Sequence, residues 1–306
     1  MDLLGSGAAV PINGKTRLLG VLGWPVEHTR SPVMHNAALL RAEINAVYLP
    51  LPVRPEHLPA ALAGMRAMQF IGGSVTIPHK EATAPLMDHL TDIAAAIGAV
   101  NTVRVEPDGR LTGHNTDGEG AVRALAEDGT DVRGRHVVIA GAGGAARGTA
   151  AGCALAGAGA ITILNRTPAR AEKLVQELSS SSALPRSIRW EAGGLDHPVD
   201  WPEVAAFLQM SSAGMDGDRT VPVDTAILPP QCHVLEAVYS PLETPLLEQA
   251  RARGLRVTDG LAMLLEQGAA AFEFWLGRTP DRRVMREALT AAPGKADRSA
   301  GQQAKR

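Results

Sequence analysis

The sequence predicts an α/β protein built from two domains. Two observations lead to this prediction. Short apolar runs rich in β-branched residues alternate with helical segments through about the first 117 residues, and a wholly apolar run at 137–140 then enters a glycine-rich turn. The length of 306 residues suits two ordinary domains, and 45% hydrophobic with 20% charged residues is typical of a globular chain with a sizeable core.

The first domain, expected to span 1–117, should hold a mostly parallel sheet. Strands are predicted over three apolar runs, 17–23, 45–53 and 70–78. Helical segments separate them at 31–43 and 55–68. Two further strand-like runs within 99–115 flank a Pro-Asp-Gly turn, which predicts a hairpin at the edge of this sheet.

Residues 118–260 are expected to form the second domain. A helix at 119–129 leads to the apolar strand, the glycine-rich turn, a helix of small residues and a second apolar strand. Later elements are strands at 205–210, 233–239 and 255–259, and a helix at 244–254. Helices within 261–292 are expected to complete the first domain. Residues 179–187 should form a surface loop, and residues 293–306 should form a disordered tail.

Composition excludes several classes of protein. A formal net charge of −2 gives no general attraction to nucleic acid or anionic lipid, so neither is an expected partner. Cys153 and Cys232 lie far apart in apolar surroundings, which predicts reduced buried thiols and no zinc site or other metal site. The first residues lack the features of a signal peptide, and no run is long enough to span a membrane. A cytoplasmic protein is therefore expected.

The glycine-rich turn predicts a cofactor site. Its glycines at 141, 143, 144 and 148 come close to the dinucleotide-binding spacing without matching its third glycine. Because the turn follows a buried strand and opens a helix, its backbone N–H groups and the positive helix end would face a pyrophosphate. A tight turn without a ligand is the alternative interpretation.

The end of the next strand favours NADP over NAD. An NAD-binding protein would usually present an acid there to the ribose hydroxyls, and this chain has none. Asn165 could hydrogen-bond a ribose, while Arg166 and Arg170 could hold a 2′-phosphate with their guanidinium groups. The alternative is that these arginines are solvated residues at a helix start.

Polar residues at strand ends of the first domain predict a substrate site. Thr29 and Ser31 precede a helix at Pro32, where their hydroxyls could bind a small carboxylate or merely cap the helix. Lys80 could donate a proton or hydrogen bond to an oxygen that gains charge, although most lysines are solvated surface residues. A nearby carboxylate favours its ammonium form and burial opposes it, so its protonation state stays open.

Lys80 is expected to lie near a cleft between the two domains. Three further residues at neighbouring strand ends are expected to face this cleft: Thr76, Asn101 and Asp117. Asp117 lies between glycines in LTGHNTDGEG, residues 111–120, where it could shape a turn or take part in chemistry.

Eight motifs in order closely resemble the shikimate dehydrogenase family, from about Leu18 to Gly277. They are GWPVEHTRSPVMHN, GGSVTIPHK, GAVNTV, GHNTDGEG, GAGGAAR, NRTPARA, VYSPLETPLLEQARARG and DGLAMLLEQGAAAFEFW. The resemblance implies an N-terminal substrate domain, a Rossmann-type NADP-binding domain and an active site in the interdomain cleft. It also implies NADPH-dependent, reversible reduction of 3-dehydroshikimate to shikimate, a step of the chorismate pathway in aromatic amino acid biosynthesis.

Carried over by position, the resemblance implies that Lys80 is the catalytic lysine and Asp117 its partner carboxylate. The implied substrate-binding residues are the carboxylate-binding pair Thr29 and Ser31, together with Thr76, Asn101, Tyr239 and Gln267. The implied cofactor-binding residues are Gly141, Ala142, Gly143, Gly144 and Ala145 at the pyrophosphate, Asn165, Arg166, Thr167 and Arg170 at the ribose phosphate, and Asp92, Ala237 and Gly260 elsewhere.

Departures from the family pattern leave the substrate open. Thr29 replaces a usual Ser, and Ser74 stands where Asn is usual. Glu236 stands where Asp is common, and QMSSAGM at 209–215 only partly matches the usual Asn-Ala-Thr-Ser-x-Gly-Met. These changes keep quinate and aminoshikimate dehydrogenases as alternatives.

Functions from other protein classes are less well supported by the sequence. A methylenetetrahydrofolate dehydrogenase lacks this motif order. An NADP-sensing regulator without turnover is disfavoured because Lys80 and Asp117 are both present. A homodimer is a further possibility for the assembly.

Overall fold

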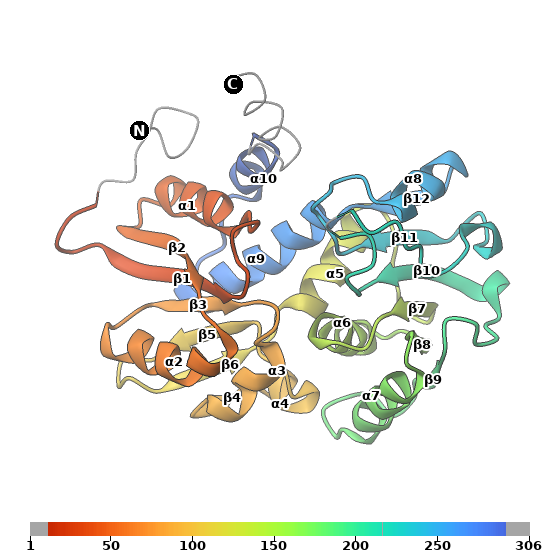
Figure 1. The fold of residues 1–306 in the computed structure, drawn as a ribbon, viewed down its shortest axis with the longest axis horizontal. Coiled ribbons are helices and arrows are strands. Elements are labelled where there is room, and N and C mark those ends of the chain that lie inside the picture. Colours follow the sequence, from red (N-terminus) through yellow and green to blue (C-terminus); the bar gives the residue numbers. More distant parts are fainter. Residues whose placement is uncertain (1–11, 216, 292–306) are drawn as a thin grey trace. The chain divides into compact units, whose positions relative to one another are not determined.

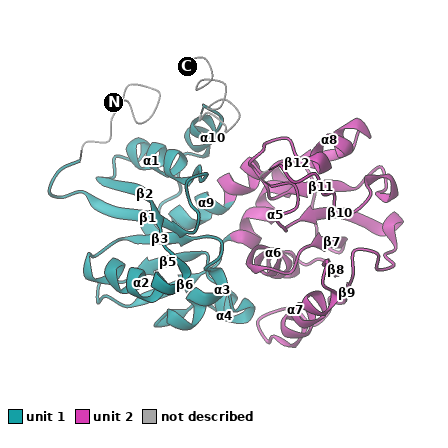
Figure 2. Ribbon diagram, viewed as in Figure 1, with its two compact units in different colours: residues 1–116, 267–293 teal, residues 117–266, 294–306 magenta. Residues whose placement is uncertain are grey.

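The computed structural model describes residues 12–215 and 217–291, and the chain divides into two compact units (Figure 1 and Figure 2). Of the described residues, those up to Thr116 and from Gln267 onward belong to unit 1, and Asp117–Glu266 belongs to unit 2. The tail at 293–306, expected to be disordered, lies outside the described residues. The predicted α/β class with mostly parallel sheets is confirmed.

Unit 1 contains a six-stranded sheet in the order β2-β1-β3-β5-β6-β4. Its strands are β1 (Arg17–Gly23), β2 (Ala46–Pro52), β3 (Gly72–Val75), β4 (His89–Leu90), β5 (Thr102–Val105) and β6 (Leu111–His114). β1 pairs in parallel with β2 and β3, and β5 runs antiparallel to β3 and β6. The predicted hairpin therefore forms, but β4 pairs outside it. The edge position was wrong because a two-residue strand shows no alternation pattern.

The helices of unit 1 cover this sheet. They are α1 (Ser31–Arg41), η1 (Pro55–His57), α2 (Leu58–Ala67), α3 (Lys80–Thr83), η2 (Ala84–Leu86), α4 (Asp92–Ile97), α10 (Arg282–Ala291) and the later part of α9 (Gly260–Leu276). Asn36 fixes α1 to β2, since its amide donates to the Tyr48 carbonyl (2.9 Å) and its carbonyl oxygen accepts from the Tyr48 N–H (2.8 Å). Figure 1 shows α10 beside α1, and the two helices pack together.

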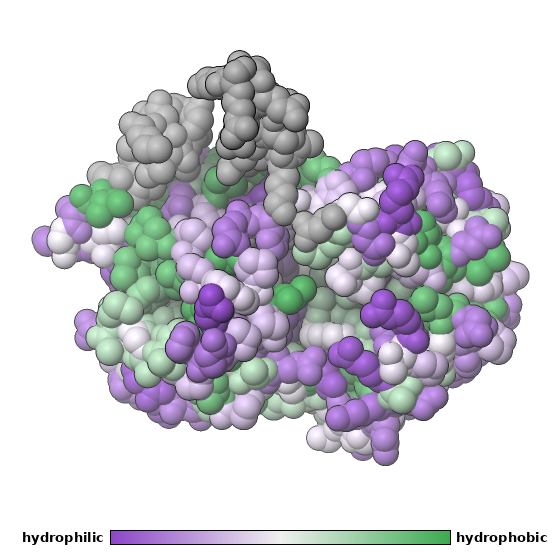
Figure 3. All heavy atoms as spheres, viewed as in Figure 1, coloured by the Kyte–Doolittle hydropathy of each residue, from purple (hydrophilic) through white to green (hydrophobic). Residues whose placement is uncertain are grey.

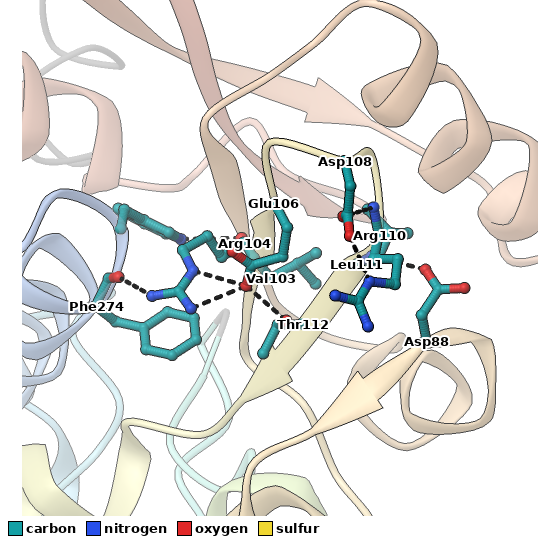
Figure 4. Close-up of polar contacts among 10 residues, drawn as sticks. Asp88, Val103, Arg104, Glu106, Asp108, Arg110, Leu111, Thr112 and Phe274 are labelled. Carbon is teal, nitrogen blue, oxygen red and sulfur yellow. Dashed lines mark hydrogen bonds and ion pairs between the residues drawn. The ribbon is translucent and has the colours of Figure 1, made fainter.

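The hairpin β5–β6 holds the end of α9 (Figure 4). Arg104 donates to the Phe274 carbonyl (3.1 Å), and its guanidinium lies 4.6 Å from the centre of the Phe274 ring. Arg104 also pairs with Glu106, which accepts from the Thr112 hydroxyl (2.6 Å). Trp275 donates from its indole nitrogen to the Val103 carbonyl (3.0 Å). These bonds fix the part of α9 that carries Gln267 to the unit 1 sheet.

Unit 2 contains a six-stranded, wholly parallel sheet in the order β12-β11-β10-β7-β8-β9. Its strands are β7 (His136–Ala140), β8 (Ala160–Leu164), β9 (Arg189–Gly193), β10 (Val204–Gln209), β11 (His233–Glu236) and β12 (Arg256–Thr258). From β7 the chain adds β8 and β9 on one side, and then crosses to add β10, β11 and β12 on the other. The boundary between β7 and β10 is therefore the topological switch point, where α/β sheets bind ligands at the carboxyl ends of their strands.

The helical elements of unit 2 are α5 (Asp117–Glu127), α6 (Gly144–Leu155), α7 (Pro168–Ser180), η3 (Trp201–Glu203), η4 (Thr225–Ile227), α8 (Pro245–Ala252) and the start of α9. α7 takes in the first two serines of the expected surface loop 179–187, so that loop is shorter than predicted. β9 was not predicted, because its partly exposed Arg-Trp-Glu run has no apolar alternation.

Two glycines, Gly118 and Gly152, allow α5 and α6 to pack closely. A Cβ on Gly118 would lie 2.3 Å from the Gly148 carbonyl, and a Cβ on Gly152 would lie 2.4 Å from the Gly118 Cα. Real Cβ atoms do not approach so closely, so side chains at these positions would separate the helices.

Hydrophobic and hydrophilic residues are mixed across the face of the molecule in Figure 3. Within the described residues, none of the helices has both the length and the apolar character needed to cross a membrane.

Candidate functional site

In unit 1, backbone hydrogen bonds bring the predicted substrate residues to one edge of the sheet. The Thr76 N–H donates to the Leu22 carbonyl (2.9 Å), which places the end of β3 beside the end of β1. The Val100 N–H donates to the Lys80 carbonyl (2.9 Å), so the start of α3 lies beside the segment that enters β5. Gly23 has no room for a side chain, since its Cβ would lie 2.5 Å from the Thr76 methyl. Thr76 and Lys80 are half-buried here.

Asn101 is the centre of a buried hydrogen-bond network at this edge. Its side-chain oxygen accepts from the Thr116 N–H (2.9 Å) and the Thr102 hydroxyl (2.8 Å). Its amide donates to the Thr116 hydroxyl (3.1 Å). Asn101 is 2% exposed, and these bonds fix its orientation. Thr116 and Thr102 are structural partners of Asn101 that the sequence motifs did not indicate.

Asp117 directly follows Thr116 and is the first residue of α5. It is 4% exposed and lies at the start of a helix rather than in a turn. A carboxylate in the first turn of a helix is also stabilised by the helix dipole. Its role as partner of Lys80 stays a prediction.

The start of α1 carries the predicted carboxylate-binding pair. Ser31 is the first helical residue, and the side chain of the N-cap residue Arg30 makes no capping hydrogen bond. The Thr29 hydroxyl accepts from the Ser31 N–H (3.3 Å), so it has a local structural role whatever else it binds. Within 12–215 and 217–291, the hydroxyls of Ser31 and Thr76 make no hydrogen bond, which leaves them able to bind a ligand.

The other predicted residues of unit 1 occupy different environments. Ser74 is buried in β3, where its Cα partners are Val21 and Thr102. Gln267 is half-buried on α9, and Asp92 is exposed at the start of the six-residue helix α4.

In unit 2, the glycine loop after β7 lies at the switch point and fits a pyrophosphate. Gly141 has a φ of +125°, and a Cβ there would lie 2.9 Å from the carbonyl group of Met210, the residue directly after β10. A Cβ on Gly143 would meet nothing within 4 Å, and no side chain caps α6. The first N–H groups of α6 therefore have neither an intrahelical acceptor nor a capping side chain, which suits them to an anionic group.

The turn after β8 presents the predicted ribose-phosphate residues. Asn165 donates to the Thr167 carbonyl (3.0 Å), which shapes the turn, and Arg166 and Arg170 are exposed around it. Hydrogen bonds from Thr220 lower the pKa of the Asp218 carboxyl, and the positive charge of Arg166 adds to this effect. An acid from the loop after β10 thus lies near Arg166.

The start of α9 packs against the segment that follows β11. A Cβ on Gly260 would lie 2.5 Å from the Val238 carbonyl, so only glycine fits there. Asp259 caps the helix by accepting from the Leu261 N–H (3.0 Å). Ala237 donates from its N–H to the Gln209 carbonyl (3.0 Å), and Ala237 and Tyr239 are half-buried beyond the strand.

Two buried polar residues end β10 and β11 and were not predicted as functional. Gln209 and Glu236 are both 0% exposed. Burial raises the pKa of the Glu236 carboxyl to about 7, against the opposing effect of hydrogen bonds from Val238, Thr244 and Ala237. A polar residue that ends an apolar run could have indicated such a site in the sequence.

Comparison with known proteins identifies the family. The model of the shikimate dehydrogenase substrate binding domain matches residues 21–103, that of shikimate / quinate 5-dehydrogenase matches 124–189, and that of the shikimate 5′-dehydrogenase C-terminal domain matches 260–290. The chain is 43% identical over 285 residues to the shikimate dehydrogenase (NADP(+)) of Geobacter metallireducens, covering 92% of this chain and 98% of that protein. This chain belongs to the shikimate dehydrogenase family.

Solved structures of similar proteins agree with this family. A shikimate dehydrogenase in complex with NADP+ superposes with a TM-score of 0.84 at 39% identity, covering 92% of this chain and 96% of that one. The quinate dehydrogenase of Corynebacterium glutamicum in complex with NAD has a TM-score of 0.81 at 28% identity, covering 90% of this chain and 99% of that one. The predicted resemblance to the shikimate dehydrogenase family is thus confirmed.

Proposed function

We propose that this chain is an NADP-dependent shikimate dehydrogenase, an oxidoreductase that reversibly reduces 3-dehydroshikimate to shikimate in aromatic amino acid biosynthesis. The observation that carries the proposal is the similarity, over nearly the whole chain, to shikimate dehydrogenases that use NADP(+). Quinate or aminoshikimate turnover and a regulator without turnover are the less favoured functions.

Unit 1 would bind the substrate and unit 2 the cofactor. The domain limits that correspond to this division are 1–117 with 261–292 for the substrate and 118–260 for the cofactor. The hydroxyls of Thr29 and Ser31 would bind the ring carboxylate at the start of α1. The other substrate contacts would come from Thr76, Asn101, Tyr239 and Gln267.

Lys80 and Asp117 would carry the acid–base chemistry. When bound, NADPH supplies the hydride that reduces the C3 carbonyl of 3-dehydroshikimate. Lys80, as an ammonium, donates a proton to the carbonyl oxygen as negative charge develops there, and accepts that proton back in the reverse reaction. Asp117 orients the Lys80 ammonium and accepts a hydrogen bond from a neighbouring ring hydroxyl. The hydrogen bonds that fix Asn101 support a preorganised ring site.

The cofactor would be held by the glycine loop and the turn after β8. Free N–H groups at the start of α6 would bind the pyrophosphate, with Gly141 to Ala145 close to it. Asn165 would contact the ribose, and the guanidinium groups of Arg166 and Arg170, with Thr167, would bind the 2′-phosphate. Asp92, Ala237 and Gly260 would add further cofactor contacts.

Initial rates test the proposal. Purified protein is given shikimate or quinate with NADP+ or NAD+, and formation of the reduced cofactor is followed by absorbance. The highest kcat/KM is expected for shikimate with NADP+. A higher kcat/KM for quinate would show that Thr29 and Ser74 have retuned the site, and the absence of any dehydrogenation would refute the enzyme assignment.

A cytoplasmic location and a homodimer complete the proposal. Cys153 and Cys232 are both buried free thiols, which suits a reducing compartment. Sedimentation of the purified protein would test the dimer.

A further inference from the structure

Strands β10 and β11 lie side by side in unit 2 and end in a matched pair of buried polar residues. Gln209 and Glu236 are Cα partners in the parallel register, and each is the last residue of its strand. Both are 0% exposed. Each side chain binds the loop that follows its own strand.

Glu236 holds both ends of the segment 237–244. One carboxylate oxygen accepts from the Val238 N–H (2.9 Å), and the other accepts from the Thr244 hydroxyl (3.0 Å). The Thr244 hydroxyl in turn accepts from the Leu247 N–H (3.3 Å) at the start of α8. A single buried carboxylate therefore fixes where this segment leaves β11 and where it enters the next helix.

Gln209 holds the loop 211–214 in the same way. Its side-chain oxygen accepts from the Ser211 N–H (3.0 Å) and from the Ser211 hydroxyl (3.0 Å). Its amide nitrogen donates to the Ala213 carbonyl (3.0 Å). The side chain thus satisfies backbone groups that would otherwise be buried without partners.

The two segments contact each other and the predicted cofactor elements. A Cβ on Gly214 would lie 3.3 Å from the Thr244 Cβ, so the loop 211–214 touches the segment 237–244. The backbone of Met210 borders Gly141, and the Val238 carbonyl borders Gly260. A continuous series of contacts therefore runs from the glycine loop to the start of α9.

We propose that Gln209 and Glu236 act together as positioning residues that hold the segments 211–214 and 237–244 in the shape that receives the cofactor. The inference rests on the proposed function, because Ala237, Tyr239 and Gly260 would contact ligands there. Gln209 and Glu236 themselves need not touch cofactor or substrate. Replacing the Glu236 carboxylate removes an acceptor from two converging donors, and a buried donor without a partner is costly.

A set of matched variants isolates this effect. Glu236→Gln changes the acceptor. Thr244→Val removes the hydroxyl that donates to Glu236 and accepts from the Leu247 N–H, while Thr244→Ser keeps both bonds. The control is Thr162→Val in the same sheet. Thr162 is also 0% exposed, and its hydroxyl donates to the Glu191 carboxylate (3.2 Å), but its hydrogen bonds do not reach either segment.

Two measurements compare the variants with the wild type. Hydrogen exchange of the full-length protein without cofactor reports the opening of 237–244, and isothermal titration calorimetry gives the Kd for NADPH. Glu236→Gln and Thr244→Val should speed exchange in 237–244 and weaken NADPH by about threefold to tenfold, the value of one lost hydrogen bond. Thr244→Ser should resemble the wild type, and Thr162→Val should leave both readouts unchanged.

Coupling between the strands adds a second test. If Gln209 and Glu236 act together, Gln209→Ala combined with Glu236→Gln should weaken NADPH by a factor different from the product of the single effects. Unchanged exchange and Kd in folded Glu236→Gln and Thr244→Val, or equal changes in Thr162→Val, would overturn the inference. If Glu236→Gln does not fold, the Thr244→Val and Thr244→Ser pair decides the question.

Failure of the proposed function would be recognised separately. That failure appears in the wild type, as no turnover of shikimate with NADP+. Failure of the positioning role appears only as a lack of difference between wild type and variants in hydrogen exchange, which needs neither cofactor nor substrate.

Discussion

Replacing Glu236 by Gln should change how the stability of the protein depends on pH. Burial raises the pKa of the Glu236 carboxyl to about 7 in the folded protein, compared with an ordinary value of 4.5. At 1.36 kcal/mol for each pH unit, this difference corresponds to about 3 kcal/mol of unfolding free energy. The folded state binds this proton more tightly than the unfolded state, so the contribution is complete below pH 4.5 and is lost as pH rises through about 7.

The assay compares urea unfolding of the wild type and Glu236→Gln by circular dichroism between pH 4.5 and 8. Other titrating groups are common to both proteins and cancel in the difference. The variant should lose about 1 kcal/mol at every pH from its altered hydrogen bonds. Relative to the wild type it should then gain about 3 kcal/mol of stability as the pH rises. A difference that stays constant with pH, or falls as pH rises, would refute the assigned burial of an ionisable carboxyl.

Three further substitutions test the site residues. Lys80→Ala should lower kcat by about 10²- to 10⁴-fold with little change in KM, as expected for a proton donor used mainly in the transition state; wild-type turnover would exclude this role. Arg166→Ala should weaken NADPH about tenfold or more and NADH hardly at all, measured by calorimetry, and equal weakening of both would rule out the 2′-phosphate contact. Gly141→Ala should weaken both cofactors and lower the Tm, because its φ is +125° and the new Cβ would meet the Met210 backbone at 2.9 Å; normal binding of both would argue against close packing of this loop.

Much of the sheet structure could be predicted because buried parallel strands have a strong local pattern. The run at 17–23 is apolar and forms β1 at those residues, and the run ending at Ala140 forms β7. The strands that were not predicted from the sequence lack this pattern. β4 has two residues, and β9 is a partly exposed edge strand.

In the candidate site, too, the features with a local sequence pattern could be predicted and the others could not. The glycine loop could be located from the sequence because its glycines directly follow a buried apolar strand, and glycine permits the φ of +125° that Gly141 adopts. The pairing of Gln209 with Glu236 depends on the register between two strands that are separated by a long loop. No local pattern encodes that register. The same holds for Asn101 and Thr116, whose contact depends on how β5 and β6 pair.

The close packing of α5 on α6 sets a fixed spacing between two chemically different helix starts. α5 begins with the Asp117 carboxylate, and α6 begins with the amides of the glycine loop at Gly144. Because Gly118 touches Gly148 and Gly152 with no side chain between them, the spacing depends on the absence of single methyl groups. An alanine at Gly118 would therefore displace the Asp117 carboxylate relative to the first amides of α6 without replacing either group. Within unit 2, the proposed catalytic carboxylate and the proposed phosphate-binding amides are thus joined by a contact that contains no functional group.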